Sequence, residues 1–380
     1  MNSFQNIINS IKSNYPNKEE IHLHEPVFLG NEKQYLTECI DSTYVSSIGK
    51  YVDLLEEKIS RLVNVEKSVA VVNGTSGLQV ALRIVGVKRD EEVLTQALSF
   101  AATTNAILLN GASPVFIDVD MDTMGLSPKS LKKFLEQNVE FKNGQPYNKL
   151  TNKRISACLP MHTFGFICRI GEIVEICNHY KIPVVEDAAE ALGSGNADGM
   201  AGTFGDIGVF SLNGNKVITS GGGGILVSKS TQLMVAAKHL TTTAKIAHKY
   251  LYNHDQLGYN FRMPNINAAL ACAQLERMNE IVENKKKLYE GYEKMFGNHK
   301  MVKIPSTTKF WNYWLFSIEL SNINERDEFL EYAYSNKIYA RPCWNLLSSL
   351  EYNKNYQQTE LTNSKLLFSK IVNIPSGANF

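Results

Sequence analysis

One stretch decides the fold of this chain: Phe210-Ser211-Leu212-Asn213-Gly214-Asn215-Lys216, followed closely by Gly221-Gly222-Gly223-Gly224. The stretch begins where a continuous apolar run ends, and such a run predicts a strand that is buried on both faces. The four glycines allow a backbone or a ligand to approach closely. We therefore interpret this stretch as a strand end and a loop that bring Lys216 to a ligand pocket.

Another apolar run ends in a second stretch, Val184-Val185-Glu186-Asp187-Ala188-Ala189-Glu190. Asp187 in this stretch lies 29 positions before Lys216. Ligand-binding groups in open α/β sheets gather at the carboxyl ends of strands. A lysine that can form a Schiff base and an acid that keeps a pyridine nitrogen protonated are what pyridoxal phosphate (PLP) requires. We prefer Asp187 to Glu186 because it is shorter and nearer the loop. A solvated surface lysine and a paired surface acid remain the alternatives.

The middle of the chain alternates apolar runs with segments of helical periodicity. Helices are predicted at Ser76–Val85, Ser127–Glu136 and Ile170–Tyr180. Such alternation predicts an α/β fold with a mostly parallel central sheet and helices on both of its faces. The predicted strands are Ser68–Val72, Val93–Thr95, Pro114–Val119, Ile155–Leu159, Ile182–Glu186, Ile207–Ser211 and Gly224–Ser228.

The length of 380 residues predicts one large and one smaller domain. We expect residues 41–264 to form the large α/β domain and residues 265–380 a small α+β domain, with residues 1–40 packing on the small domain. Asn265–Lys287 reads as one long helix that links the two, and Glu140–Thr151 as a polar loop. Three further segments are expected as regular structure, namely a helix at Glu325–Ser335 and strands at Trp311–Leu320 and Ile338–Pro342.

The composition excludes several classes of function. The net charge is +1, which leaves no electrostatic footprint for nucleic acid. No apolar run is long enough to span a bilayer, and the polar N-terminus does not resemble a signal peptide, so a cytoplasmic location is expected. The six cysteines are scattered, without a Cys-x-x-Cys pair. We expect reduced thiols and no metal site.

Further candidates for cofactor contacts lie at other strand ends. Asn73-Gly74-Thr75-Ser76-Gly77 opens a helix, where free N–H groups and the hydroxyls of Thr75 and Ser76 can bind a phosphate. Ser211 can donate to the same phosphate, and Phe100 can lie flat on a pyridine ring. The alternatives are an ordinary helix cap at Thr75 or Ser76 and simple core packing of Phe100.

Two rival ligand motifs are incomplete. Gly193-x-Gly195-x-x-x-Gly199 misses the spacing of a dinucleotide fingerprint, which disfavours an NAD-dependent oxidoreductase. Asp118-x-Asp120-x-Asp122 begins like a calcium loop but lacks its glycine and its final glutamate.

Taken together, these motifs resemble the DegT/StrS family of nucleotide-sugar aminotransferases. The resemblance rests on Asp187, on the stretch from Phe210 to Gly224, and on Gly258-Tyr259-Asn260-Phe261-Arg262-Met263-Pro264-Asn265. It extends from Pro26 to Ser376. It implies a fold-type I PLP enzyme, L-glutamate as amino donor, and a homodimer with shared active sites.

The resemblance also implies a role for individual positions. Lys216 matches the Schiff-base lysine, Asp187 the partner of the pyridine nitrogen and Phe100 the stacking aromatic. Many family members have glutamine, facing the cofactor's phenolic oxygen, where this chain has Glu190. The positions that match phosphate contacts are Thr75, Ser76 and Ser211 in the same subunit and Asn260 from the other subunit.

Several stretches, among them Leu23-His24-Glu25-Pro26 and Asn312-Tyr313-Trp314-Leu315, resemble the subgroup that serves bacillosamine and legionaminic acid synthesis. This implies amino transfer to carbon 4 of a UDP- or GDP-linked 4-keto-6-deoxy-N-acetylhexosamine. Candidate substrate contacts are His162, Arg262 and Arg341, although His162 reads equally well as a core histidine. The alternatives are a 3-keto sugar, a sugar dehydratase, which the presence of Lys216 disfavours, and a non-catalytic regulatory protein.

Overall fold

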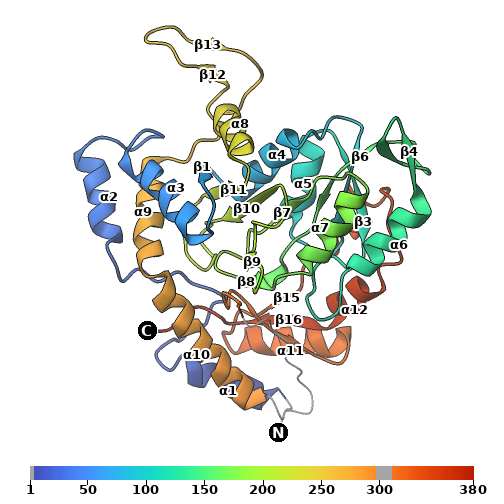
Figure 1. The fold of residues 1–380 in the computed structure, drawn as a ribbon. Helices are drawn as coiled ribbons and strands as arrows, with labels where there is room; N and C mark the ends of the chain where they lie inside the picture. The colour runs from blue at the N-terminus through green and yellow to red at the C-terminus, as the bar shows by residue number, and fades with distance from the viewer. Residues whose placement is uncertain (1–3, 297–309) are drawn as a thin grey trace.

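Seven strands form a continuous central sheet in the computed structural model, which describes residues 4–296 and 310–380. Their order is β1-β11-β10-β7-β6-β2-β3, with parallel bridges at Cys158–Val184 and Met161–Asp187 joining β6 to β7 (Figure 1). Strand β11 runs antiparallel to both of its neighbours. The predicted mostly parallel sheet is confirmed, and all seven predicted strands are present. Their bounds are β1 Lys67–Val71, β2 Glu92–Gln96, β3 Ser113–Ile117, β6 Ile155–Leu159, β7 Val185–Asp187, β10 Ile207–Ser211 and β11 Gly224–Ser228.

The strands are buried on both faces because helices cover the sheet from two sides. In β1, Val69 and Val71 belong to one apolar cluster and Ala70 to the other, as the two-residue period of a strand requires. The first cluster includes residues of α4 (Gly74–Ile84), α5 (Ala101–Leu109) and α8 (Thr231–Thr241). The second includes residues of α3 (Lys50–Leu62), α6 (Pro128–Asn138) and α7 (Ile170–His179).

The last part of the chain builds a smaller antiparallel sheet in the order β14-β16-β15. Its strands are β14 (Phe316–Glu319), β15 (Arg341–Pro342) and β16 (Ile371–Ile374), and α11 (Ile323–Ser335) and α12 (Thr362–Lys370) accompany them. Near the N-terminus, α1 (Gln5–Asn14) packs on α10 (Met278–Phe296), whereas α2 (Glu32–Asp41) packs on α9 (Asn265–Glu276). The domain boundaries themselves stay a prediction.

Two sequence predictions of local structure are wrong. The expected single helix over Asn265–Lys287 is broken at Arg277, whose ψ of 6° leaves the helical region and separates α9 from α10. The expected polar loop at Glu140–Thr151 is largely a hairpin of β4 (Val139–Lys142) and β5 (Gln145–Asn148). Asn143 and Gly144 both have positive φ angles at its turn, and Asn-Gly is the preferred pair for such a two-residue hairpin turn.

A narrow arm extends from the body of the molecule beyond α8 (Figure 1). It carries the short strands β12 (Lys245–Ile246) and β13 (Asn253–His254) and exposes Tyr250, Tyr252 and Leu257. A second short hairpin, β8 (Gly195–Asn196) with β9 (Gly199–Met200), and the 3₁₀ turns η1 (Thr163–Gly165) and η2 (Leu347–Ser349) complete the elements. None of the helices in the described part of the chain is long and apolar enough to cross a membrane.

Candidate active site

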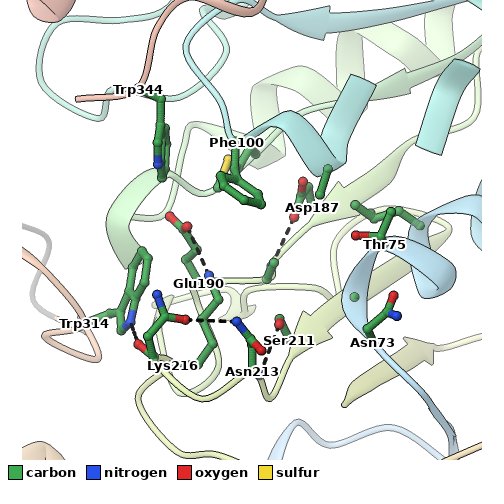
Figure 2. Close-up of a pocket in the computed structure, with 16 residues that line it drawn as sticks. Asn73, Thr75, Phe100, Asp187, Glu190, Ser211, Asn213, Lys216, Trp314 and Trp344 are labelled. Carbon is green, nitrogen blue, oxygen red and sulfur yellow. Dashed lines mark hydrogen bonds and ion pairs between the residues drawn. The ribbon is translucent and has the colours of Figure 1, made fainter. Parts of the chain in front are cut away.

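A cavity of about 300 Å³ lies where β1, β7 and β10 end and where α4 and α5 begin. The carboxyl ends of parallel strands are the usual ligand site of an open α/β sheet. Figure 2 shows the side chains that converge there from these elements. The lining residues are Asn73, Gly74, Thr75, Leu78, Phe100, Ala102, Met161, Asp187, Ala189, Glu190, Ser211, Asn213, Asn215, Lys216, Trp314 and Trp344.

Lys216 lies in the loop after β10, with its amine held between an acid and an aromatic ring. Its Nζ is 3.2 Å from Oε1 of Glu190 and 4.1 Å from the centre of the Trp314 ring. Only 13% of the side chain is exposed. A lysine on a loop of this kind is usually solvated, whereas this one points into the cavity. The structure therefore brings Lys216 to the position that nucleophilic or proton-transfer chemistry requires.

Asp187 ends β7 and is 2% exposed. Its Oδ2 accepts a hydrogen bond from the Thr103 hydroxyl at 2.7 Å, and its Oδ1 accepts one from the Ala189 N–H at 3.2 Å. Burial raises the pKa of Asp187, and the bond from Thr103 offsets part of this rise. A cation placed beside this carboxylate would restore its charged form. The arrangement suits a protonated ring nitrogen.

The N-terminus of α4 faces the same cavity. Asn73 caps this helix, because its side chain accepts a hydrogen bond from the Ser76 N–H at 2.8 Å. The cap is thus Asn73, and the helix cap considered at Thr75 or Ser76 is not present. Thr75 lines the cavity, but Ser76 does not. The free N–H groups and dipole of this first turn favour an anion such as a phosphate.

Two glycines bring the backbone segments around this helix end close together. A Cβ on Gly224 would lie 2.6 Å from the carbonyl group of Asn73, and one on Gly74 would lie 3.2 Å from Cβ of Ser211. Real Cβ atoms do not approach a backbone as closely as 2.6 Å, so the start of β11 requires glycine. The Ser211 hydroxyl consequently reaches the same end of the cavity as Thr75.

Phe100 precedes α5 and presents its ring to the cavity, with 53% of its surface exposed. This exposure excludes the alternative of simple core packing. Thr103, which holds Asp187, lies in the first turn of α5, three residues after Phe100. Sequence reasoning missed Thr103.

Glu190 stands between the lysine and the backbone of η1. Its Oε2 accepts a hydrogen bond from the Phe164 N–H at 2.9 Å, while its Oε1 contacts Lys216. Burial raises the pKa of Glu190 to about 7, although Lys216 opposes the rise. Glu190 can therefore change its charge near neutral pH beside the reactive amine.

His162 does not line the cavity. It is fully buried, and its Nε2 contacts Oε2 of Glu186 at 2.9 Å while its Nδ1 accepts a hydrogen bond from the Cys168 N–H. Both ring nitrogens are thus engaged within the protein. The structure therefore does not support the predicted substrate contact at His162. It supports the alternative, a core histidine whose hydrogen bonds are satisfied within the protein.

Three other predicted residues also lie outside the cavity lining. Asn260 is exposed near the base of the arm and accepts hydrogen bonds from Arg262, at 3.2 and 3.0 Å. Arg341 is exposed on β15 in the smaller sheet. A single subunit therefore does not bring these side chains to Lys216, and their roles in binding remain predictions.

Sequence reasoning did not single out the two tryptophans of the cavity. Trp314 precedes β14, and Trp344 follows β15, so both come from the C-terminal part of the chain. Trp314 lies in a stretch that carried the family resemblance, which was a usable signal. Nothing in the sequence around Trp344 indicated that it returns to the end of β7.

The donor set of the cavity fits PLP. A helix N-terminus with two hydroxyl groups nearby would suit the phosphate, Asp187 would suit the ring nitrogen, Phe100 offers an aromatic face, and Lys216 supplies an amine that can form a Schiff base. These groups come from four separate strand ends. Together they match one cofactor better than any single motif does.

Comparison with known proteins gives the same result. A family model described as the DegT/DnrJ/EryC1/StrS aminotransferase family matches residues 29–380. The chain is 33% identical to a GDP-perosamine synthase of Escherichia coli O157:H7, covering 94% of this chain and 93% of that one. It is 34% identical to a putative pyridoxal phosphate-dependent aminotransferase, EpsN, of Bacillus subtilis, covering 95% and 92%.

A third relative, from Campylobacter jejuni, is a UDP-4-amino-4,6-dideoxy-N-acetyl-β-L-altrosamine transaminase, 32% identical over 70% of this chain and 66% of its own length. Among solved structures, Helicobacter pylori PseC, an aminotransferase of pseudaminic acid biosynthesis, superposes with a TM-score of 0.86. Its identity to this chain is 21%, with 95% and 94% of the two chains covered. This likeness confirms the fold.

Proposed function

This chain belongs to the DegT/DnrJ/EryC1/StrS aminotransferase family, and from that premise we propose that it moves an amino group from L-glutamate to a nucleotide-linked sugar. It is a PLP-dependent aminotransferase. The proposed acceptor is carbon 4 of a UDP- or GDP-linked 4-keto-6-deoxy-N-acetylhexosamine. The observation that carries the proposal is the convergence of Lys216, Asp187 and the α4 N-terminus on one cavity.

The residues of the cavity divide the work of the reaction. PLP supplies an electron sink when bound. Asp187 holds the proton on the ring nitrogen, while Thr75, Ser211 and the first turn of α4 bind the phosphate. The Nζ of Lys216 takes a proton from the α-carbon of glutamate and later delivers one to the sugar carbon. Glu190 lies close enough to Lys216 to hold or exchange that proton.

The names of the relatives support a nucleotide-linked sugar but differ in the carrier. One relative is a GDP-perosamine synthase, and another acts on a UDP-linked 4-amino-4,6-dideoxy sugar. The choice of carbon 4 rests on the subgroup resemblance together with these two names. Amination at carbon 3, or no turnover at all, are the competing outcomes of the test.

The test uses ¹⁵N-labelled L-glutamate with UDP- and GDP-linked 4-keto-6-deoxy sugars. NMR of the product then shows which sugar carbon carries the labelled nitrogen. We expect the label on carbon 4, with Lys216→Met as an inactive control. Label on carbon 3 would replace the proposed substrate, and a lack of label with every acceptor would remove the nucleotide-sugar proposal.

A homodimer with shared active sites is part of the proposal. Asn260 and Arg262 lie outside the cavity of their own subunit, beside an arm that exposes aromatic side chains. This arrangement suits a site completed by a second copy. If it is, mixing inactive Lys216→Ala and Asn260→Ala subunits restores activity in the hybrid. Hybrids that stay inactive, or a monomeric active enzyme, would contradict shared sites.

A further inference from the structure

Trp314 and Trp344 lie at one end of the cavity. In Figure 2 both indoles are on the side of Glu190, while Thr75 and Asp187 are on the opposite side. The contacts agree with this view. Trp314 lies over the Lys216 amine at 4.1 Å, and the ring of Trp344 is 4.8 Å from the ring of Phe164, whose N–H binds Glu190. The cofactor-binding groups leave this end of the cavity for the substrate.

Trp344 is held firmly in an apolar wall. Its ring also meets Phe100 edge-on at 6.2 Å. The chain on either side is anchored in both sheets, because the Cys343 N–H binds the Ile371 carbonyl in β16 and the Leu347 N–H binds the Ala97 carbonyl near β2. A ring that is fixed in this way can select a ligand by shape without a cost for ordering the side chain.

Trp314 is fixed by its polar atoms. Its indole N–H donates to the Asn215 carbonyl at 2.6 Å. Its backbone carbonyl accepts a hydrogen bond at 3.1 Å from the buried amine of Lys285. The ring face is therefore presented to Lys216. Trp314 therefore lies beside the Lys216 amine, and Trp344 lines the neighbouring part of the cavity.

We infer that Trp344, supported by Phe100 and Phe164, is the specificity residue for the carbon-6 methyl group of the sugar. This inference rests on the proposed function. Carbon 6 is two bonds from carbon 4, so a sugar whose carbon 4 reaches Lys216 carries its carbon 6 close to that amine. Glu190 contacts that amine and also accepts a hydrogen bond from the Phe164 N–H, and the Phe164 ring packs against the Trp344 ring. Trp344 itself lines the cavity.

The indole of Trp344 lines the cavity, whereas the Phe164 ring that packs against it is fully buried and supports it from behind. Such an aromatic surface treats a methyl and a hydroxymethyl group differently. A methyl group gains from burial against aromatic carbon, whereas a hydroxyl group loses its bonds to water. Apolar pockets discriminate against an added hydroxyl group by roughly 10²-fold at most. Wild-type protein is therefore expected to bind 6-deoxy sugars about 10- to 100-fold more tightly than 6-hydroxy sugars.

The experiment measures binding to the PLP-loaded protein, with no reaction taking place. The probes are two matched pairs without a ketone: UDP-N-acetylglucosamine with its 6-deoxy analogue, and GDP-mannose with GDP-6-deoxymannose. Titration calorimetry gives the ratio of the two Kd values in each pair. The variants are Trp344→Ala, the conservative Trp344→Phe, and Phe141→Ala as a control at an exposed aromatic residue on β4.

We expect the 6-deoxy preference in at least one pair to fall to about 1 in Trp344→Ala, to persist in part in Trp344→Phe, and to be unchanged in Phe141→Ala. A far-UV circular dichroism spectrum and a urea-unfolding transition like those of wild type show that Trp344→Ala is folded. If Trp344→Ala does not fold, Trp344→Leu takes its place and should also lose the preference.

Three results would overturn the inference. A wild-type ratio near 1 in both pairs, or a ratio that survives in Trp344→Ala, removes it while leaving the proposed amination intact wherever labelled product still forms. Absence of binding to every probe, together with absence of labelled product, removes the nucleotide-sugar function and this inference with it.

Discussion

Glu186 and Asp187 are neighbours on β7, and their side chains point into different surroundings. Because successive side chains on a strand point to opposite faces, one acid enters the protein interior and the other enters the cavity. Both oxygens of Glu186 are saturated by hydrogen bonds from the N–H groups of Gly202, Phe204 and Gly205 and by the ring of His162. Asp187 accepts two hydrogen bonds from protein groups and keeps capacity for another partner.

The difference teaches how to recognise a functional carboxylate among buried ones. A carboxylate with about four acceptor positions, all of them used by the protein, organises the chain around it. A buried carboxylate with positions left over, at the edge of a cavity, is available to a ligand. The sequence favoured Asp187 because it is shorter and nearer the loop, and in the structure the alternation of side chains along β7 separates the two acids.

The largest expected effect is on the reaction rate, and it comes from replacing Asp187, the acid that faces the cavity. Asp187→Asn keeps the shape but cannot hold a proton on the ring nitrogen, so the rate of the glutamate half-reaction should fall at least about 10³-fold, roughly 4 kcal/mol of barrier. The stability of the cofactor-free protein should not fall, because burial disfavours the charged carboxylate. Stopped-flow absorbance and urea unfolding measure the two. A variant that is unstable but fully active would reverse the assignment.

Replacing Glu186, the acid that faces the interior, should lower stability and leave the reaction rate nearly unchanged. Glu186→Gln replaces one oxygen with an NH₂ group that faces existing N–H donors, so the free energy of unfolding should fall by about 3–4 kcal/mol. The glutamate half-reaction of the protein that remains folded should stay within a few-fold of wild type. Urea denaturation and the same stopped-flow assay provide the readouts. A large loss of rate with unchanged stability would refute the distinction between these two acids.

Glu190, a third buried acid, should make the stability of the protein depend on pH. Between pH 4.5 and about 7 the unfolded chain has released this proton while the folded protein still keeps it, so stability falls as the pH rises. Gln cannot ionise. The stability of Glu190→Gln relative to wild type should therefore increase by up to about 3 kcal/mol across this window and stay level above it. Urea unfolding of cofactor-free protein at a series of pH values tests this, and a flat difference would contradict it.

The smallest effect compares two asparagine caps. Asn73 caps α4 at the cavity, and Asn322 caps α11 in the smaller sheet region by accepting from two N–H groups. Replacing either with alanine should cost about 1 kcal/mol of stability. Asn73→Ala alone should also weaken PLP binding, since it disturbs the phosphate end. Equal PLP affinity in the two variants, measured by fluorescence titration, would argue against a phosphate site at α4.

Much of the fold could be predicted because its signals are local. Continuous apolar runs gave the seven strands of the sheet, and strand ends located Lys216, Asp187, Ser211, Phe100 and Thr75, which the structure brings to one cavity. The break at Arg277 was missed because no glycine or proline marks it between residues 265 and 287. The β4–β5 hairpin was missed although its Asn143-Gly144 turn was visible.

The remaining features depend on contacts between distant parts of the chain. Trp344 reaches the cavity from 157 positions beyond Asp187, and no local pattern reports that return. His162 looked like a substrate contact but faces Glu186 in the interior, because the strand that carries Glu186 turns that side chain away from the cavity. Asn260 and Arg262 lie outside the cavity in a single subunit, so their predicted roles depend on a second copy.

The central claim is that Lys216 and its neighbours form a PLP-dependent amino-transfer site. Its most direct test is the absorbance of PLP-loaded protein before and after L-glutamate is added. We predict a band at ~410–430 nm that moves to ~330 nm in wild type, and no such band shift in Lys216→Ala. A wild-type protein that takes up no PLP, or whose band ignores glutamate, would contradict the account.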